Sequence, residues 1–443
     1  MKKHLYILFI LFTATGFAQQ KKWTLQECLN YAEKNNLQLK QSQFDIEQAK
    51  LNKQNALGLF LPNLNANASG SWNSGLTQNV TTGILETQTT FGGSGTISSN
   101  LNLFNGLKNR YTYKKSLLEI LSAQYAFADL QYNINVQIVG AYVQILLNKE
   151  NFESAQVQLE NSIQQKEKTI EMIKAGILPQ GDLTDAEAQI TNDHLQVIQM
   201  ENAYKLSKLN LTQLLELNDI SIFDIDESLS GLGINQNLLQ QSPEQLFEIA
   251  LQHNKKIKQS VTQEQIADYQ IKLVHSARMP SLSAFANLYS RYSDLDYYDF
   301  TGQVIPADPF WYQIQDNYGI SYGLNLHIPV FNGFTVKNQV NSAKLSAEKV
   351  KINTVNTRKK LKSDIYKMYQ DLQSAYQSMQ AAEANLKAQR KAYDYAKEKF
   401  DVGMLNIFDL NNIKTKYMRA EIQYINAKYQ YYLKSKVLEF TVN

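Results

Sequence analysis

LNLFNGLKNR at residues 101–110 and LNLHIPVFNGFTVKNQ at residues 324–339 share the tripeptide Phe-Asn-Gly. In both stretches an alternating polar and apolar run precedes the tripeptide, and a long segment without proline follows it. Alternation indicates a strand, whereas the following segment has the composition of a helix. Asn and Gly tolerate the backbone conformations that such a change needs. The predicted strand-to-helix junctions are Asn105 with Gly106 and Asn332 with Gly333.

The two junctions belong to a tandem repeat. WTLQECLNYAEKNNLQLKQS, from Trp23, aligns with QSPEQLFEIALQHNKKIKQS, from Gln241, at an offset of 218 residues (241 minus 23). Beyond the tripeptides the offset is 227 (331 minus 104), which aligns Gly176 with Gly403. One unit has therefore been duplicated. We predict a first repeat at 19–221, a linker at 222–241 and a second repeat at 242–443.

The amino terminus has the pattern of a secretory signal peptide. Lys2 and Lys3 precede an apolar run, and a small-residue site ends at Ala18, after which we expect cleavage. The net charge of +3 then falls to +1 (3 minus 2), which gives no indication of nucleic acid binding. Cys28 is the only cysteine, so we expect a buried apolar residue rather than a disulfide or a lipid anchor.

Each repeat is expected to open with a helix and continue with two strands. The pairs Thr24 with Glu27 and Ser242 with Gln245 have the spacing of a capping box, in which two side chains satisfy free N–H groups at a helix start. These helices are predicted to end near Leu57 and Ala277, before Pro62 and Pro280. A strand, a loop and a second strand follow at 62–106 and again at 280–333, with exposed loops at 73–95 and 291–318.

The four predicted strands alternate between one apolar face and one small, uncharged polar face. Each is about ten residues long, which is the length of a tilted strand that crosses a membrane. Aromatic residues near the strand ends suit a lipid–water interface, although they also suit loop packing in a soluble sandwich. These aromatic residues are Trp72, Tyr289, Tyr292, Trp311 and Tyr312.

Long helices are predicted after both junctions, at 107–175 and 334–402. Each would extend roughly 100 Å at 1.5 Å per residue. Gly176 and Gly403 end them, and returning helices are expected at 182–217 and 409–440. Spacings of three and four residues in the second long helix indicate a coiled-coil seam. The seam residues are Ile365, Met368, Leu372, Ala375, Met379 and Ala382.

This plan resembles the TolC family of outer-membrane efflux ducts over essentially the whole mature chain. The resemblance rests on the duplicated order of elements, Leu-Pro-Asn-Leu at 61–64, the two junctions, and Phe400-x-x-Gly403 followed by Asp409-Leu410. It implies an α+β membrane protein, a homotrimer in which four strands per chain form a twelve-stranded β-barrel, and a long α-helical coiled-coil tunnel in the periplasm. It also implies a passive duct of a tripartite efflux or type I secretion system, placed in the bacterial outer membrane and its lipid, with a periplasmic adaptor and an inner-membrane pump as partners.

The residues support parts of this reading independently. Four strands leave two unpaired edges, which lipid does not tolerate, so several chains must pool their strands. The sequence contains no motif for a catalytic nucleophile, a phosphate-binding loop or a cofactor. We therefore expect neither an enzyme nor a bound cofactor or metal. The histidines of the mature chain are His194, His253, His275 and His327, without metal-ligand spacing. An exported coiled-coil scaffold or adhesin is the alternative, but it leaves the strands unexplained. Nothing selects a cargo among drugs, metal ions, peptides and proteins.

The resemblance also implies where function lies. The family closes its tunnel at the helical turns and meets its partners there, which makes Gly176 and Gly403 the expected adaptor-docking turns. Asp182 and Asp409 match acidic family positions near the constriction, and Asp185 adds an acid one turn on. The alternative for each Asp is a helix N-cap. The sequence departs from the family where Asn412 replaces a second Asp and Leu405 replaces an arginine that locks the closed state.

Overall fold

The structure is a computed structural model that describes residues 22–78, 84–217, 223–226, 236–299 and 301–442. The predicted signal peptide lies outside these residues, as does half of the predicted linker, at 222 and 227–235. The chain divides into two compact units. The first contains residues 1–43, 126–255 and 358–443, and the second contains residues 44–125 and 256–357.

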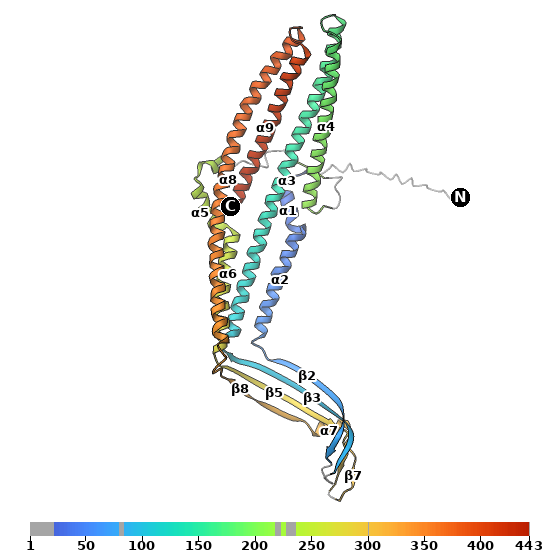
Figure 1. The fold of residues 1–443 in the computed structure, drawn as a ribbon. Coiled ribbons are helices and arrows are strands. Elements are labelled where there is room, and N and C mark those ends of the chain that lie inside the picture. The colour runs from blue at the N-terminus through green and yellow to red at the C-terminus, as the bar shows by residue number, and fades with distance from the viewer. Residues whose placement is uncertain (1–21, 79–83, 218–222, 227–235, 300, 443) are drawn as a thin grey trace, which may run out of the picture. The chain divides into compact units, whose positions relative to one another are not determined.

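The second unit contains a four-stranded antiparallel sheet in the order β2-β3-β5-β8 (Figure 1). The strands are β2 (Asn63–Gln78), β3 (Leu85–Asn105), β5 (Ser281–Ser293) and β8 (Gly319–His327). The first two have 16 and 21 residues and are longer than expected. Most of the predicted loop at 73–95 is therefore strand. Its threonines favour extended backbone, and the Thr89 hydroxyl donates a hydrogen bond to Ser74 Oγ at 2.8 Å across the hairpin.

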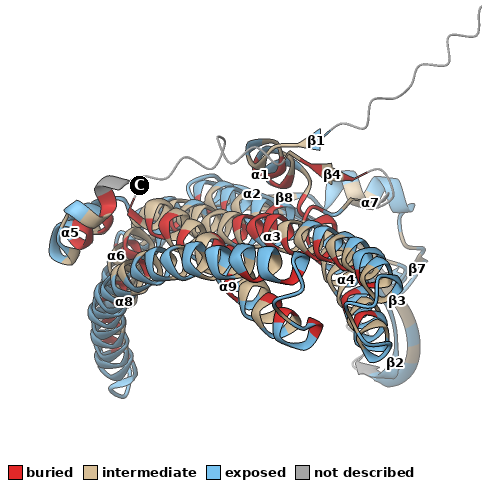
Figure 2. Cartoon of the chain, turned by 90° about the horizontal axis from the view of Figure 1, so that it is seen from above, coloured by how far each residue is buried: buried red, intermediate tan, exposed pale blue. Residues whose placement is uncertain are grey.

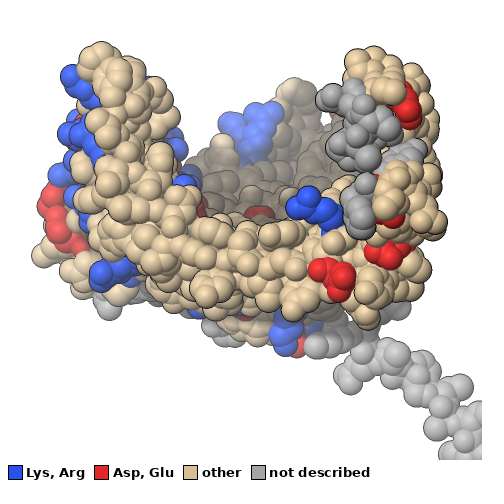
Figure 3. All heavy atoms as spheres, turned by 90° about the horizontal axis from the view of Figure 1, so that it is seen from below, with Lys and Arg blue, Asp and Glu red and all other residues tan. Residues whose placement is uncertain are grey.

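The register gathers the apolar residues of all four strands on one face. Ala66 lies opposite Ile97, Ile97 opposite Leu288, and Leu288 opposite Ile320. A β-bulge between Asn102 and Phe104 shifts the register beside the first junction. Glu86 and Arg291 are the only Asp, Glu, Lys or Arg residues in these strands. Figure 3 colours Lys and Arg blue and Asp and Glu red, and most of the surface that it shows belongs to other residues.

The connection between β5 and β8 contains more structure than the exposed loop expected at 291–318. It holds the short strands β6 (Tyr297–Tyr298) and β7 (Val304–Ile305) and the helix α7 (Phe310–Asp316). A chain of aromatic contacts, with ring centroids 4.7 to 6.0 Å apart, joins this connection to the apolar face of the sheet. Its members are Trp72, Phe91, Tyr292, Phe310 and Trp311.

Both repeats open with the predicted capping box, but the helix that follows is divided. The capping boxes of Thr24 and Ser242 are confirmed. The expectation of a single helix at the start of each repeat was wrong, because Asn36 and Asn254 adopt extended backbone and end the first helical segment. Asn36 Oδ1 then accepts hydrogen bonds from the backbone N–H groups of the next turn, so this residue also starts the second segment. The four helices are α1 (Leu25–Asn35), α2 (Leu37–Gly58), α5 (Pro243–His253) and α6 (Lys255–His275).

The long helices lie within one residue of the predicted bounds. They are α3 (Lys108–Lys174) and α8 (Thr335–Asp401), each of 67 residues, and Gly140 does not interrupt α3. The returning helices are α4 (Gly181–Leu214) and α9 (Ile407–Val442). In the predicted seam of α8, Ile365 and Leu372 are buried. No helix among the described residues is both long and apolar enough to cross a membrane.

The core of the first unit gathers around the middle of α3. Ile138, Val139 and Ile145 of α3 are fully buried there, and Figure 2 marks the buried positions in red. Cys28 belongs to this core, which confirms its expected burial. The short strands β1 (Lys22–Trp23) and β4 (Asp224–Ile225) pair in parallel beside it. The Tyr142 hydroxyl fixes them by donating to the carbonyl of Asp226 at 2.6 Å.

Candidate functional site

The strand-to-helix junctions, in the second unit, use two consecutive left-handed residues. Gly106 and Leu107 have φ of 65° and 68°, and Gly333 and Phe334 have φ of 57° and 64°. Neither Asn105 nor Asn332 has a positive φ, and the residue after each glycine shares the left-handed conformation instead. Asn105 contributes through its side chain, which hydrogen-bonds the Asn109 side chain at 2.6 Å.

The two junction glycines differ in their surroundings. A Cβ atom at Gly106 would lie 2.5 Å from the carbonyl oxygen of Ser276 and 2.6 Å from Met279 Cβ, so only glycine fits. A Cβ atom at Gly333 would meet nothing within 4 Å. Gly333 is therefore required by its backbone angle alone, which a residue with a side chain adopts at a cost of about 1–2 kcal/mol.

The helical turns of the first unit end both long helices in the same way. Gly176 and Gly403 each have φ of 74°. The N–H of the following residue reaches back to the helix, from Ile177 to the Met172 carbonyl at 2.9 Å and from Met404 to the Lys399 carbonyl at 2.8 Å. This is the Schellman arrangement, in which a left-handed residue satisfies the last free carbonyl groups of a helix.

Large apolar side chains at these turns are exposed. Ile177 is 57% exposed and Met404 is 79% exposed, and the neighbouring Val402 and Phe408 are also exposed. Beneath them Phe400 and Ile407 are buried in a small core that Leu405 partly covers. Exposed apolar residues that cluster on an ordered turn are typical of a surface that another protein contacts.

The acids of the predicted gate take different positions at these turns. Asp182 lies in the first turn of α4 but is not its N-cap, which is Gln180. Its Oδ2 atom is buried and has no hydrogen-bond partner among the described residues. Burial raises the pKa of Asp182, and the negative charge of the exposed Asp185 raises it further. The charged form of the Asp182 carboxyl is therefore disfavoured at this position, and the residue is not the N-cap of α4.

Asp409 does take part in capping, although it is not the N-cap itself. Asn406 holds that position: its Oδ1 atom accepts from the Asp409 N–H at 2.8 Å, and its amide donates to Asp409 Oδ2 at 2.9 Å. Asn412 is exposed on the next turn, and Leu405 packs on the core beneath the turn. Within the described part of the chain, no hydrogen bond or ion pair joins Asp409 to Asp182 or Asp185.

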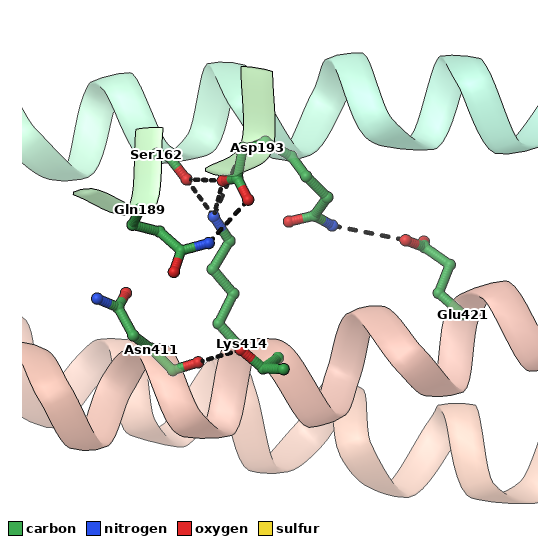
Figure 4. Close-up of polar contacts among 8 residues, drawn as sticks. Ser162, Gln189, Asp193, Asn411, Lys414 and Glu421 are labelled. Carbon is green, nitrogen blue, oxygen red and sulfur yellow. Dashed lines mark hydrogen bonds and ion pairs between the residues drawn. The ribbon is translucent and has the colours of Figure 1, made fainter. Parts of the chain in front are cut away.

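A buried ion pair that the sequence analysis missed ties three helices together near these turns (Figure 4). Lys414 Nζ of α9 lies 3.0 Å from Asp193 Oδ2 of α4, and the two side chains are only 5% and 3% exposed. The Ser162 hydroxyl of α3 donates to Asp193 and accepts from Lys414. Gln189 donates to Asp193 Oδ1 at 2.7 Å. We call Lys414, Asp193, Ser162 and Gln189 the Lys414 cluster.

The polar atoms of the Lys414 cluster have hydrogen-bond partners, and little space for water lies beside them. Burial lowers the pKa of Lys414, and the opposite charge of Asp193 acts against that change. The cavity beside the lysine has a volume of about 10 Å³, which is the lower limit for one water molecule. A buried charge pair of this kind stabilises little compared with apolar residues, but removal of one partner leaves the other charge buried and unpaired.

The cluster is one level of a series of polar contacts along α9. Glu421 accepts a hydrogen bond from the Ser154 hydroxyl of α3 at 2.6 Å, and Lys428 forms an ion pair with Glu150 of α3 at 2.8 Å. Lys414, Glu421 and Lys428 are seven residues apart and alternate in charge, and we call them the polar seam. A heptad of charged residues among apolar neighbours was visible in the sequence, but its partners on α3 and α4 were not.

Comparison with known proteins agrees with this fold. The family model for outer membrane efflux proteins matches residues 28–216 and 246–442, one segment in each repeat. No curated protein sequence matches the chain. Among solved structures, the CusC channel aligns with a TM-score of 0.77 at 15% identity over 95% of this chain and 92% of that one.

Two further channels align similarly. The CmeC outer membrane channel of Campylobacter jejuni gives 0.71 at 21% identity, over 94% of this chain and 85% of that one. The MtrE outer membrane channel of Neisseria gonorrhoeae, solved in an open state, gives 0.73 at 14% identity, over 94% and 88%. These likenesses establish the fold, and the family match covers both repeats. The chain belongs to the outer membrane efflux protein family, a family of channels, and is an efflux channel of the outer membrane that extends into the periplasm.

Proposed function

We propose that three copies of this chain assemble into one duct. The observation that supports this most is the four-stranded sheet, which has one apolar face and whose edges are β2 and β8. Unpaired strand edges are not stable in lipid, because their N–H and C=O groups have no water to bind. Pairing of β2 in one copy with β8 in the next removes every edge, and three copies give a closed barrel of twelve strands.

The apolar face of the barrel then contacts lipid, and the face that carries Asn65, Asn67 and Ser98 lines a water-filled lumen. Gln78 at the end of β2, Leu85 at the start of β3 and the helix α7 lie at the sheet end opposite the junctions, and this end faces the cell exterior. A short epitope inserted at residue 301 should therefore be detected by antibody on intact cells. An epitope detected only after the outer membrane is permeabilised would reverse this topology.

The duct works with a periplasmic adaptor and an inner-membrane pump, which supplies the energy. The adaptor docks on the two helical turns around Gly176 and Gly403, where Ile177, Met404 and Phe408 are exposed. Charged substitutions there, such as Met404→Glu, should abolish substrate export by the complete complex. The conductance of the isolated channel in planar bilayers should remain, because that measurement needs no adaptor.

The periplasmic end of the duct is also its gate. Asp182, Asp185 and Asp409 recur three times around the axis of a trimer and make the constriction acidic, with Asn412 and Leu405 beside them. The family arginine is absent, so we assign the closed arrangement to the Lys414 cluster, which ties α9 to α3 and α4. That a related channel has been solved in an open state supports a gate that moves.

Conductance tests the proposal directly. The purified chain, reconstituted into planar bilayers, should form a pore, and native mass spectrometry in detergent should give the mass of three chains. A monomer that forms no pore would contradict both the trimer and the duct.

A further inference from the structure

The second unit contains an apolar groove between α7 and the sheet. Its volume is about 720 Å³, within the ~300–1,000 Å³ range of small-molecule pockets. Strands β2, β3 and β5 form the floor, and α7 together with Tyr318, which follows it, forms one wall. The lining includes Ala68, Gly95, Ile97, Leu288, Ile314 and Tyr318.

Small residues produce this hollow. Ala66 and Ala68 of β2 lie beside Gly95 and Ile97 of β3, and a Cβ atom at Gly95 would meet nothing within 4 Å. Larger side chains stand on the same face farther along the strands, where Leu324 and Leu326 occur. The groove is therefore a local depression in the apolar face.

The wall of the groove is held in place by polar contacts that leave its interior apolar. The Ser290 hydroxyl donates to the Ile314 carbonyl at 2.9 Å, and Asn317 donates to the Arg291 carbonyl at 3.1 Å. Gln313 donates to the Ser293 carbonyl at 2.8 Å and accepts from its N–H at 3.0 Å. These contacts fix α7 against β5, so the groove exists before any ligand arrives.

We infer that the groove binds an acyl chain of a zwitterionic phospholipid. The inference rests on the proposed function, in which the apolar face of the sheet contacts the membrane. Trp311 and Tyr312 of α7 are exposed beside the groove, as expected for a short helix at a lipid–water interface. The segment from Arg291 to Tyr318 has five aspartates and one arginine, which disfavours an anionic headgroup at the groove mouth.

Photo-crosslinking tests the site on the full chain in vesicles. The probe is a phosphatidylethanolamine with a diazirine in one acyl chain, and peptide mass spectrometry locates the adducts. We expect the adducts to concentrate on residues 314–318 relative to Leu324, which shares the apolar face outside the groove. A matched phosphatidylglycerol probe should label residues 314–318 less.

Ala68→Phe fills the groove, and Ala286→Phe is its control on the same face outside the groove. Each methylene excluded from an apolar site weakens binding by about fourfold. Ala68→Phe should therefore lower labelling of residues 314–318 by more than ~10-fold and leave labelling at Leu324 unchanged, whereas Ala286→Phe should retain the groove adducts.

Several outcomes would overturn the inference. Adducts spread evenly over the apolar face, equal labelling by both probes, or no effect of Ala68→Phe would each show that the groove holds no specific lipid. Native mass spectrometry that finds only detergent on the purified trimer would show binding of an adventitious additive only. If Leu324 is also unlabelled while the protein is folded, the membrane-facing assignment of the sheet itself fails, and the proposed function fails with it.

Discussion

Lys414→Met should loosen the helical turns far more than a surface substitution does. The substitution removes the ammonium but leaves the Asp193 carboxylate 3% exposed, with Ser162 and Gln189 as its remaining donors. Breaking a buried ion pair from one side costs ~3–5 kcal/mol. The two remaining donors place Lys414→Met at the low end of this range, about 3 kcal/mol.

Asp193→Leu should cost more, about 4–5 kcal/mol, because the buried ammonium then has only the Ser162 hydroxyl and the Gln158 carbonyl, at 3.4 Å, as acceptors. The double variant Lys414→Met with Asp193→Leu replaces the charges by apolar groups of similar volume. It should lie within ~1 kcal/mol of the parent protein, because apolar replacement of a buried pair is often neutral.

Hydrogen exchange of the assembled protein measures these differences locally. A loss of about 3 kcal/mol corresponds to a fall of more than ~100-fold in backbone protection in peptides from α4 and α9 around the cluster. Lys416→Met, on the exposed side of α9, is the matched control and should change nothing. Single variants with parental protection, or a double variant as unprotected as Lys414→Met, would refute the assignment of this cluster as the tie between the helices.

Three further predictions concern the junctions and the acids. Gly106→Ala should prevent assembly, because the added methyl group would meet the Ser276 carbonyl oxygen. Gly333→Ala should cost only ~1–2 kcal/mol, because only its backbone angle opposes a side chain. The yield of protein in the outer membrane and the heat stability of the proposed trimer distinguish the two variants. The pKa of Asp182 is raised in the folded chain, so its charged form opposes folding once the pH exceeds the unfolded pKa of ~3.9. Asp182→Asn should therefore stabilise the proposed trimer against heat at pH ~7 and have no effect at pH ~3. Replacing Asp182, Asp185 and Asp409 together by Asn should lower cation selectivity in planar bilayers without loss of stability of the proposed trimer, since Asn at 409 still offers Asn406 a carbonyl oxygen. Unaltered selectivity would exclude these acids from the gate.

Local signals in the sequence predicted the local features of the fold. Capping boxes involve residues three apart, and Gly176 and Gly403 end helices through contacts within six residues, so both could be identified without knowledge of the tertiary structure. The breaks at Asn36 and Asn254 had a signal as well, because these asparagines align between the repeats. The alignment indicates duplication, whereas the end of a helix at each asparagine depends on its extended backbone.

Features that depend on distant pairing were not predictable. The glycine- and threonine-rich segment at 85–95 becomes strand because β2 pairs with all of it and β5 pairs with it from Gly92 onward. Lys414 is buried because Asp193, 221 residues away in the sequence, supplies the opposite charge. The family resemblance indicated acids at the turns, but the environment of Asp182 depends on burial that no sequence motif specifies.

The polar seam sets the position of α9 along α3 and α4. Heptad packing repeats every seven residues, so an entirely apolar α9 could slide along α3 by ~10 Å and pack almost as well. With alternating charges, a slide in one direction places Glu421 beside Asp193, and a slide in the other direction places it beside Glu150. Either error brings two like charges together between the helices. In a chain that contains two similar repeats, the polar seam therefore specifies which helices α9 packs against and its position along them.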